Sequence, residues 1–235
     1  MTDADEREGE AVSLLSIWPD DITGVLIGGY AVAAYGQARH SEDLDIAVAS
    51  FAAARWREWL REQGLTLQRT YRAPDASRVS LEVQRWNRDS LWVDLMSGGI
   101  RDRDSGVVIP EDWILEHPRT LVLELLSGRV DHPIQVVRLE GLWATKLLAG
   151  RGQDIADLFA LSRQPVDIGS VRSLFARVET PKLKRKMESV VRGLDDERLY
   201  ADTLSRLGLG SPTRHENRRR WNLFSQMVRN AVSRG

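Results

Sequence analysis

The segment from Val25 to Val48 most constrains the fold of this 235-residue chain. It opens with the apolar run Val25-Leu26-Ile27, which ends at the pair Gly28-Gly29, and continues into a stretch of small residues typical of a short helix. A second apolar run then carries Asp43 and Asp45 at alternate positions. Successive side chains of a strand point to opposite faces, so both carboxylates point the same way. The segment therefore predicts a strand, a tight turn, a short helix and a second strand.

The remaining patterns divide the chain into a mixed first part and a helical second part. In the first part, we expect helices at 11–18 and 51–62, a turn at 73–77, and strands at 24–27, 43–48, 65–71, 78–84, 90–96 and 135–137. In the second, helices are expected at 139–148, 153–161, 167–178, 182–192, 195–207 and 216–232, separated by glycine and proline. The predicted fold is α+β, with a mixed β-sheet flanked by helices over residues 1–137 and a helical bundle over 138–235.

Composition excludes several classes of protein. The chain has no cysteine, which excludes disulfides and thiolate chemistry, and its four histidines, His40, His117, His132 and His215, show no zinc-site spacing. The acidic start lacks the pattern of a secretion signal, and no apolar run approaches the roughly 18 residues of a membrane span. We expect a soluble cytoplasmic protein that does not bind membranes.

A third acid completes a candidate metal site. Asp94 lies inside the apolar run 91–96, where an ionised side chain is costly unless it is paired or bound to a metal. With Asp43 and Asp45 it would form a cluster able to hold one or two Mg²⁺ ions, or Mn²⁺, through oxygen ligands. Two such ions, roughly 3.5–4 Å apart, can bridge a triphosphate and activate an attacking hydroxyl.

The glycine pair suits the same chemistry. Backbone N–H groups at Gly28 and Gly29 can approach phosphate oxygens without an intervening Cβ. A lone Gly-Gly is most often only a tight turn, and an Asp-x-Asp is commonly a solvated strand edge. Their combination with Arg39 and Ser41 within about twenty residues favours a nucleotide site.

These residues resemble a known signature. The pair Gly28-Gly29 is followed, after thirteen intervening residues that include Arg39 and Ser41, by Asp43-Leu44-Asp45. This pattern resembles the nucleotidyltransferase (polymerase-beta-like) superfamily, and more narrowly the AbiEii/MenT toxins of type IV toxin–antitoxin systems. The resemblance implies a nucleotidyltransferase catalytic domain at residues 1–137, with metal binding by the two motif aspartates and Asp94. Most relatives have Gly-Ser where this chain has two glycines, so the serine hydroxyl that would contact phosphate is missing here. Most relatives also have threonine where this chain has Ser41.

A second block, around Lys146, resembles that group's Lys-x(4)-Arg-x-x-Asp-x-x-Asp element. Lys146 lies on an otherwise apolar helix face, where it should have an anionic partner. In the enzymatic interpretation, Lys146 and Arg39 neutralise the triphosphate, while Asp154 and Asp157 face the nucleotide or bind Arg151. The alternative is a surface salt-bridge set formed by the arginine and the two aspartates.

The resemblance implies Mg²⁺-dependent transfer of a nucleoside monophosphate from an NTP to a hydroxyl acceptor, such as the 3′ end of tRNA or a protein side chain. Basic runs at 182–186 and 214–234 suit an RNA backbone or an acidic antitoxin, although such runs are usually solvated helix faces. Two alternatives stay open: a small-molecule nucleotidyltransferase of the antibiotic-modifying type, and a non-catalytic module that binds a nucleotide or a partner.

Overall fold

The computed structural model describes residues 3–72, 81–209 and 214–233, so the predicted turn at 73–77 lies outside the described residues. The chain divides into two compact units. The sheet unit comprises Met1–Ile100 and Ile109–Arg138, and the helical unit comprises Arg101–Val108 and Leu139–Gly235. Residues 101–108 thus belong with the helices, although the sequence pattern groups them with the strands.

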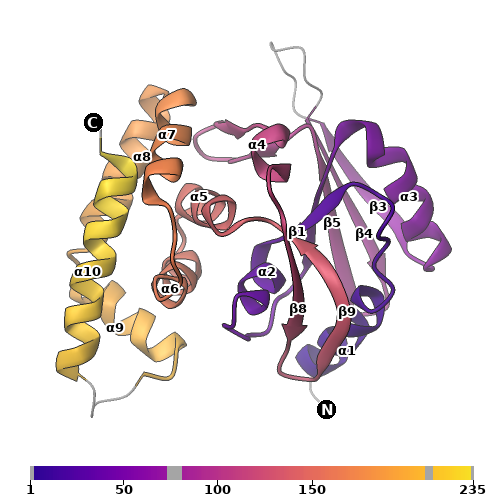
Figure 1. Ribbon diagram of the computed structural model, residues 1–235, viewed down its shortest axis with the longest axis horizontal. Coiled ribbons are helices and arrows are strands. Elements are labelled where there is room, and N and C mark those ends of the chain that lie inside the picture. Colours follow the sequence, from indigo (N-terminus) through magenta and orange to yellow (C-terminus); the bar gives the residue numbers. More distant parts are fainter. Residues whose placement is uncertain (1–2, 73–80, 210–213, 234–235) are drawn as a thin grey trace. The chain divides into compact units, whose positions relative to one another are not determined.

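A seven-stranded mixed sheet forms the centre of the sheet unit, in the order β3-β4-β5-β2-β1-β9-β8 (Figure 1). Within it, β2 pairs in parallel with β5 and β1 in parallel with β9, and the other neighbours are antiparallel. The apolar runs of the sequence occupy the buried middle of the sheet. The strands are β1 (Gly24–Ile27), β2 (Leu44–Val48), β3 (Thr66–Arg72), β4 (Glu82–Arg88), β5 (Leu91–Ser97), β8 (Arg119–Glu124) and β9 (Arg129–Val136).

Short helices and a small hairpin complete this part of the chain. The helices are α1 (Asp3–Leu15), α2 (Gly28–Ala34), α3 (Ala53–Glu62) with a preceding 3₁₀ turn η1 (Ser50–Ala52), and α4 (Glu111–Leu115). A separate two-stranded sheet pairs β6 (Ile100–Arg101) with β7 (Val108–Ile109). Trp56 of α3 is buried and donates its indole N–H to the carbonyl of Thr23 at 3.1 Å. A Cβ at Gly24 would lie 2.8 Å from that indole nitrogen, so only glycine allows α3 this close to β1.

Several sequence predictions for this unit were incomplete. The first helix runs from Asp3 to Leu15 rather than over 11–18, because three acids in its first turn suit the positive end of a helix. The predicted strand at 135–137 is the end of the longer β9, whose Pro133 and exposed polar residues hide the strand pattern. Its partner β8, and α4, were not predicted, since the first is largely exposed and the second is one short turn.

The six predicted helices of the second part are confirmed, with ends that differ by at most two residues. They are α5 (Leu139–Ala149), α6 (Gly152–Leu161), α7 (Ile168–Arg177), α8 (Pro181–Gly193), α9 (Glu197–Arg206) and α10 (Arg214–Val232). Side chains of Asp167, Thr180 and Asp196 cap the starts of α7, α8 and α9 by accepting backbone hydrogen bonds. Among the described residues, no helix is long and apolar enough to span a membrane.

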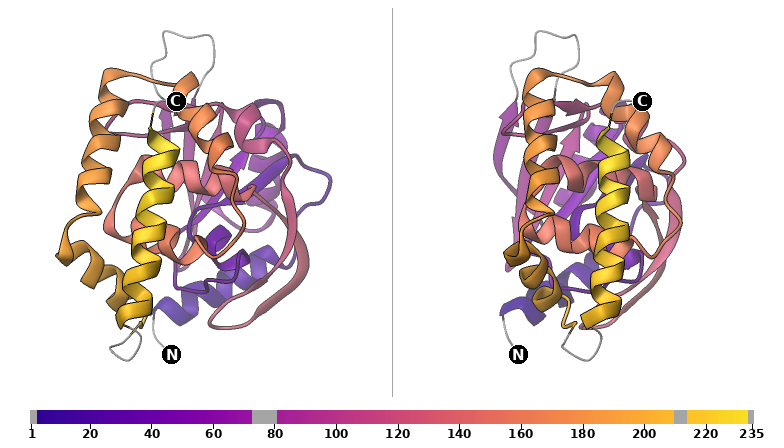
Figure 2. Two further views of the ribbon diagram at one scale, coloured as in Figure 1. Left: turned by 60° about the vertical axis from the view of Figure 1, so that its left-hand side comes forward. Right: turned by 90° about the vertical axis from the view of Figure 1, so that its left-hand side faces the viewer.

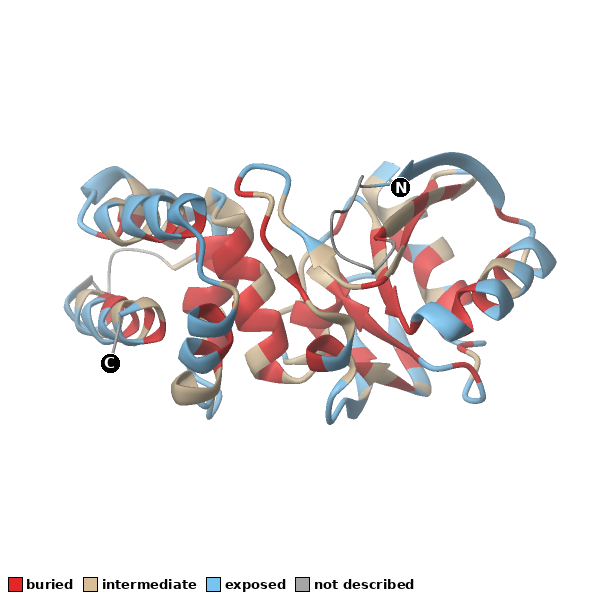
Figure 3. Ribbon diagram, turned by 90° about the horizontal axis from the view of Figure 1, so that it is seen from above, coloured by how far each residue is buried: buried red, intermediate tan, exposed pale blue. Residues whose placement is uncertain are grey.

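The core of the helical unit is aromatic. Phe159, Trp221 and Phe224 pack within 5.4–5.6 Å of one another, and Trp143 and Tyr200 extend the cluster. In Figure 2, α10 (yellow) runs beside α7 and α8 (orange), with which it is in contact. Helices α5 and α6 are buried along most of their length (red in Figure 3). A helix that is apolar nearly all round is central to its bundle, which is the position of α5.

A half-buried ion pair in the helical unit, between Asp102 and Lys186, predicts acid sensitivity. Burial raises the pKa of the Asp102 carboxyl, but hydrogen bonds from Lys186 and Ser105 outweigh burial and lower the pKa below its ordinary value of 3.8. A carboxyl whose folded pKa is lowered stabilises the protein above the unfolded pKa, and that contribution disappears as the pH falls through the folded pKa. We therefore expect the free energy of unfolding, measured by urea titration from about pH 6 to pH 2, to fall less steeply in Asp102→Asn than in the wild type. Asp104→Asn is the control, since the Asp104 side chain is 83% exposed.

Candidate functional site

The three predicted metal ligands come together where the start of β2 lies beside the middle of the neighbouring strand β5. Asp43 immediately precedes β2, Asp45 lies on β2, and Asp94 lies on β5. In the parallel pairing of these strands, Asp45 stands directly opposite Asp94. One carboxylate oxygen from each of the three residues lies within 4.8 Å of the others. Strand alternation explains the first pair, and strand pairing brings in the third.

A positive charge that the sequence did not single out accompanies this cluster. Arg85 of β4 pairs in register with Asp94, and its guanidinium lies 3.7 Å from Asp43 Oδ2 and 3.7 Å from Asp94 Oδ1. The same guanidinium stacks over the ring of Trp92 at 4.9 Å. Arginine beside clustered carboxylates offsets their mutual repulsion. Its place depends on strand register, for which the sequence carried no signal.

The glycine turn is built around the same carboxylates. Gly28 has a φ of +68°, and a Cβ there would lie 1.9 Å from Asp45 Oδ2. A side chain at this position would therefore be strained and would occupy the space beside the cluster. The start of α2 thus lies against Asp45 only because residue 28 is glycine.

The second glycine has a different neighbour. A Cβ on Gly29 would lie 2.3 Å from Ser41 Oγ and 3.1 Å from Arg39 Nη2. The Ser41 hydroxyl, with Ser41 only 9% exposed, thus occupies the space where a side chain of residue 29 would begin. The signature that this chain resembles has a serine at position 29. Here the hydroxyl of Ser41 lies where the side chain of that serine would begin. The structure thereby brings Gly29, Arg39 and Ser41 together.

The same segment of the chain carries two tyrosines and a histidine. Burial, with a smaller effect from Glu8, raises the pKa of the Tyr30 phenol, so this side chain stays protonated. His40 lies with Nδ1 3.7 Å from Oε1 of Glu8. Tyr35 donates its hydroxyl to the carbonyl of Val137 at 2.8 Å, which is a packing contact.

The residues present suit a divalent cation. Three carboxylates offer hard oxygen ligands at a spacing that one or two Mg²⁺ or Mn²⁺ ions can bridge. Because Gly28 has no Cβ, the Asp45 carboxylate can lie directly against the glycine turn. The donor set contains no histidine or cysteine, which argues against zinc.

A substitution at Gly28 tests this packing. We expect Gly28→Ala to lower the free energy of unfolding by more than about 1–2 kcal/mol, the cost of a left-handed backbone with a Cβ, because the methyl group also meets Asp45. Gly36→Ala is the matched control, since Gly36 has a φ of +90° but nothing within 4 Å of its Cβ position. Equal destabilisation of the two variants in urea unfolding would contradict the close approach.

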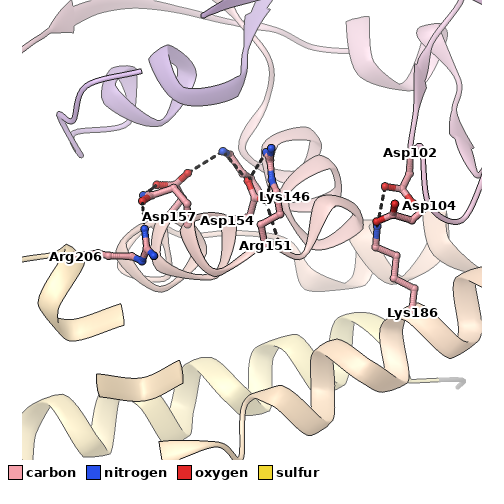
Figure 4. Close-up of polar contacts among 9 residues, drawn as sticks. Asp102, Asp104, Lys146, Arg151, Asp154, Asp157, Lys186 and Arg206 are labelled. Carbon is pink, nitrogen blue, oxygen red and sulfur yellow. Dashed lines mark hydrogen bonds and ion pairs between the residues drawn. The ribbon is translucent and has the colours of Figure 1, made fainter. Parts of the chain in front are cut away.

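Lys146, Asp154 and Asp157 form a buried cluster of their own in the helical unit (Figure 4). Lys146 Nζ lies 3.0 Å from Asp154 Oδ1 and 2.7 Å from Asp157 Oδ2, and the three side chains are 7%, 1% and 0% exposed. Arg151 donates its backbone N–H and its Nε to Asp154, which caps the start of α6. Asp157 also accepts from Gln153 at 3.0 Å.

The expected anionic partner of Lys146 is therefore a pair of aspartates from its own unit. Because both aspartates are buried, the set is not the surface salt-bridge group that the spacing also allowed. A role for these three residues toward a nucleotide stays a prediction. Their contacts show what the lysine does in the fold: it neutralises two carboxylates between α5 and α6.

The arginines of α10 are largely engaged within the helical unit. Arg218 pairs with Glu197 and stacks over Tyr200 at 3.9 Å, and Arg220 stacks over Phe159 at 4.7 Å. Arg229 pairs with Asp195 at 2.7 Å. These contacts fasten α10 to its neighbours and leave fewer of its cations available to an RNA backbone than the sequence suggested.

Comparison with known proteins completes the description. A model of the family described as nucleotidyl transferase AbiEii toxin, type IV TA system, matches residues 14–233. No curated protein sequence matches the chain significantly.

Solved structures show weaker similarity. JHP933 from Helicobacter pylori is 16% identical, covering 97% of this chain and 92% of its own, with a TM-score of 0.45. TM1012 from Thermotoga maritima, a protein proposed to be a nucleotidyltransferase, is 17% identical, covering 68% of this chain and 94% of its own, with a TM-score of 0.45. ANT(2″)-Ia in complex with adenylyl-2″-tobramycin is 13% identical, covering 94% and 97%, with a TM-score of 0.37. The assignment rests on the family match, and since that match spans nearly the whole chain, the protein belongs to the AbiEii nucleotidyl transferase toxins of type IV toxin–antitoxin systems.

Proposed function

We propose that this protein transfers a nucleoside monophosphate from an NTP to a hydroxyl acceptor, using divalent cations held by Asp43, Asp45 and Asp94. The observation that carries the proposal is the convergence of three carboxylate oxygens within 4.8 Å, beside a glycine turn that Asp45 can approach because Gly28 has no Cβ. Mg²⁺ is the cation we expect, with Mn²⁺ as the substitute.

The residues of the site have different roles in the proposed reaction. The three aspartates hold the cations, and Asp94 also accepts the proton of the acceptor hydroxyl, whose oxygen forms a bond to the α-phosphorus as the bond to pyrophosphate breaks. Divalent ions held by these aspartates would supply positive charge that offsets the triphosphate and would lower the pKa of the attacking hydroxyl. Backbone N–H groups at Gly28 and Gly29 position the phosphate oxygens.

Two polar side chains extend the phosphate contacts. The Ser41 hydroxyl and the Arg39 guanidinium both lie close to Gly29, as the distances from its Cβ position show. A hydroxyl donor and a cation beside backbone N–H groups suit the charge of a triphosphate. We assign both residues to nucleotide binding, and Lys146, Asp154 and Asp157 to the same role only as a secondary proposal, given their mutual pairing.

The identity of the acceptor molecule is a separate and more specific part of the proposal. Family membership implies an antitoxin partner and an NTP substrate. A toxin acts on a molecule that the cell needs, and we propose the 3′ end of tRNA as acceptor, with a protein side chain as the competing outcome of the test.

A labelling experiment tests the proposal. Purified protein is incubated with each α-³²P-labelled NTP, Mg²⁺ and total tRNA, and the label is followed into RNA, protein or neither. We expect label in RNA with at least one NTP and none when EDTA replaces Mg²⁺. Label in protein would reassign the acceptor, and no label in either fraction with any of the four NTPs would overturn the transfer reaction on these acceptors.

Arg85 gives a further expected result. Its guanidinium lies 3.7 Å from two of the three carboxylates and therefore competes with a bound cation. Its side chain is 34% exposed, so the interaction is worth only about 1 kcal/mol, and we expect Arg85→Met to bind Mn²⁺ about fivefold more tightly in the absence of NTP. Arg69→Met, on the exposed strand β3, is the control for lost charge. Titration calorimetry measures both; weaker Mn²⁺ binding by Arg85→Met would contradict the competition.

A further inference from the structure

A concave site lies wholly within the helical unit. It is a cavity of about 670 Å³, within the range of small-ligand sites. Its walls include α8, the turn between α5 and α6, and residues 104–105. We call it the α8 pocket; the residues that matter here are Arg151, Lys182, Arg185, Lys186, Ser189 and Asp104.

The pocket is strongly basic because of helix geometry. Lys182, Arg185, Lys186 and Ser189 stand three, four and seven residues apart along α8, so they share one face of the helix. Leu183 and Met187 are buried, and Lys184 points away, lining a different cavity. The continuous basic run of the sequence is thus divided between sides of one helix. Four cations and one carboxylate line the α8 pocket.

The four cations differ in how they are held. Lys186 Nζ lies 2.7 Å from Asp102 and 3.3 Å from Asp104, and Arg151 binds Asp154 (Figure 4). Lys182 and Arg185 are exposed, and within the described part of the chain the structure gives them no acidic partner. Lys186 and Arg151 are therefore already paired with carboxylates, whereas Lys182 and Arg185 are available to a ligand.

The wall of the α8 pocket is tightly packed at the C-terminal end of α5. Gly150 has a φ of +65°, and a Cβ there would lie 3.0 Å from Val190 Cγ2 of α8. The α5–α6 turn therefore lies directly against α8 at a position that favours glycine. This contact keeps Arg151 and the cations of α8 around one cavity.

We propose that the α8 pocket binds the phosphate groups of a polyanionic ligand, at a site made by residues other than the metal cluster. Lysine and arginine are the side chains that recognise phosphate, and Ser189 adds a hydroxyl donor. The cavity is larger than one phosphate needs, and its available cations stand one helical turn apart. The chemistry suits consecutive phosphates, either of an RNA strand or of a free pyrophosphate or nucleotide. The inference does not depend on the transfer reaction.

The test measures binding by the full chain without metal. A fluorescein-labelled single-stranded RNA oligonucleotide is titrated in EDTA against the Asp45→Asn protein, so that metal-dependent binding at the aspartate cluster does not contribute. Lys182→Glu/Arg185→Glu is expected to weaken binding by roughly tenfold or more. The plot of log K against log salt concentration is expected to become less steep by about 1.4, because two phosphate contacts are lost and each contributes about 0.7 on a single strand.

Charge reversal at Lys184 is the matched control, because this lysine is exposed on the same helix but outside the pocket. The proposal requires Lys184→Glu to bind within about twofold of the parent. Equal weakening by Lys184→Glu and by Lys182→Glu/Arg185→Glu would mean diffuse attraction and would overturn it, as would no binding of RNA or of pyrophosphate by the parent. Pyrophosphate that displaces the RNA assigns the pocket to free phosphates, whereas RNA binding that resists pyrophosphate assigns it to the RNA backbone; both support a phosphate site.

Discussion

Replacing Asp45 or Asp94 with asparagine is expected to abolish nucleotide transfer while leaving the chain folded. Each substitution removes one anionic ligand from a cluster whose oxygens lie within 4.8 Å of one another. Metal-held charge contributes several kcal/mol to the transition state, so transfer should fall by roughly a thousandfold or more. Incorporation of label from α-³²P-NTP measures the loss.

Stability distinguishes this result from unfolding. Loss of one charge from three neighbouring carboxylates relieves repulsion, so the melting temperature should stay the same or rise. Glu42→Gln is the matched control, because Glu42 is exposed, belongs to the same motif and is not part of the cluster. Full activity of Asp45→Asn, or an equal loss in Glu42→Gln, would remove the cluster from the mechanism.

Replacing Lys146 with methionine is expected to cause the largest loss of stability. The lysine neutralises Asp154 and Asp157, which are 1% and 0% exposed. Removing one partner of a buried ion pair leaves uncompensated charge and typically costs about 3–5 kcal/mol. Urea unfolding, followed by the fluorescence of the tryptophans in the helical core, measures the change.

Two further variants make this expectation specific. Lys184→Met removes an exposed lysine from α8 and should change the free energy of unfolding by less than about 0.5 kcal/mol. Adding Asp157→Asn to Lys146→Met should recover part of the loss, because it removes one of the stranded charges. If Lys146→Met instead unfolds like the wild type but binds NTP more weakly, Lys146 acts on the triphosphate and not in the fold.

Local periodicity accounts for what could be predicted of the fold. The helices after residue 138 repeat apolar residues at helical spacing and end at glycine or proline, so the sequence alone located all six. Strands β8 and β9 escaped complete prediction, because edge strands with exposed polar residues and Pro133 lack the apolar run of a central strand. Nor does the sequence pattern indicate that residues 101–108 belong with the helices, since that grouping depends on contacts such as Asp102 with Lys186.

Some residues of the candidate site could likewise be predicted from local sequence patterns, and others could not. Alternation along β2 placed Asp43 and Asp45 on one face, and the cost of burying an acid in an apolar strand indicated Asp94. Arg85 was missed because its place beside the cluster depends on which residue of β5 it faces. The position of Ser41 could not be predicted either. Its hydroxyl lies where a side chain of residue 29 would begin because the loop folds back on the glycine turn.

The sequence by itself determined the residue types of the chemistry, namely three acids, a glycine pair and a basic run, because strand alternation, turns and helical spacing are local properties. Only the tertiary structure decided which of these residues meet. It set Arg85 between two acids, turned Lys146 inward onto two aspartates, and divided the 182–186 run so that Lys182 and Arg185 line a cavity while Lys184 does not. Charge–charge and close-packing interactions act across space at a few ångströms, and strand register and helix orientation set those distances.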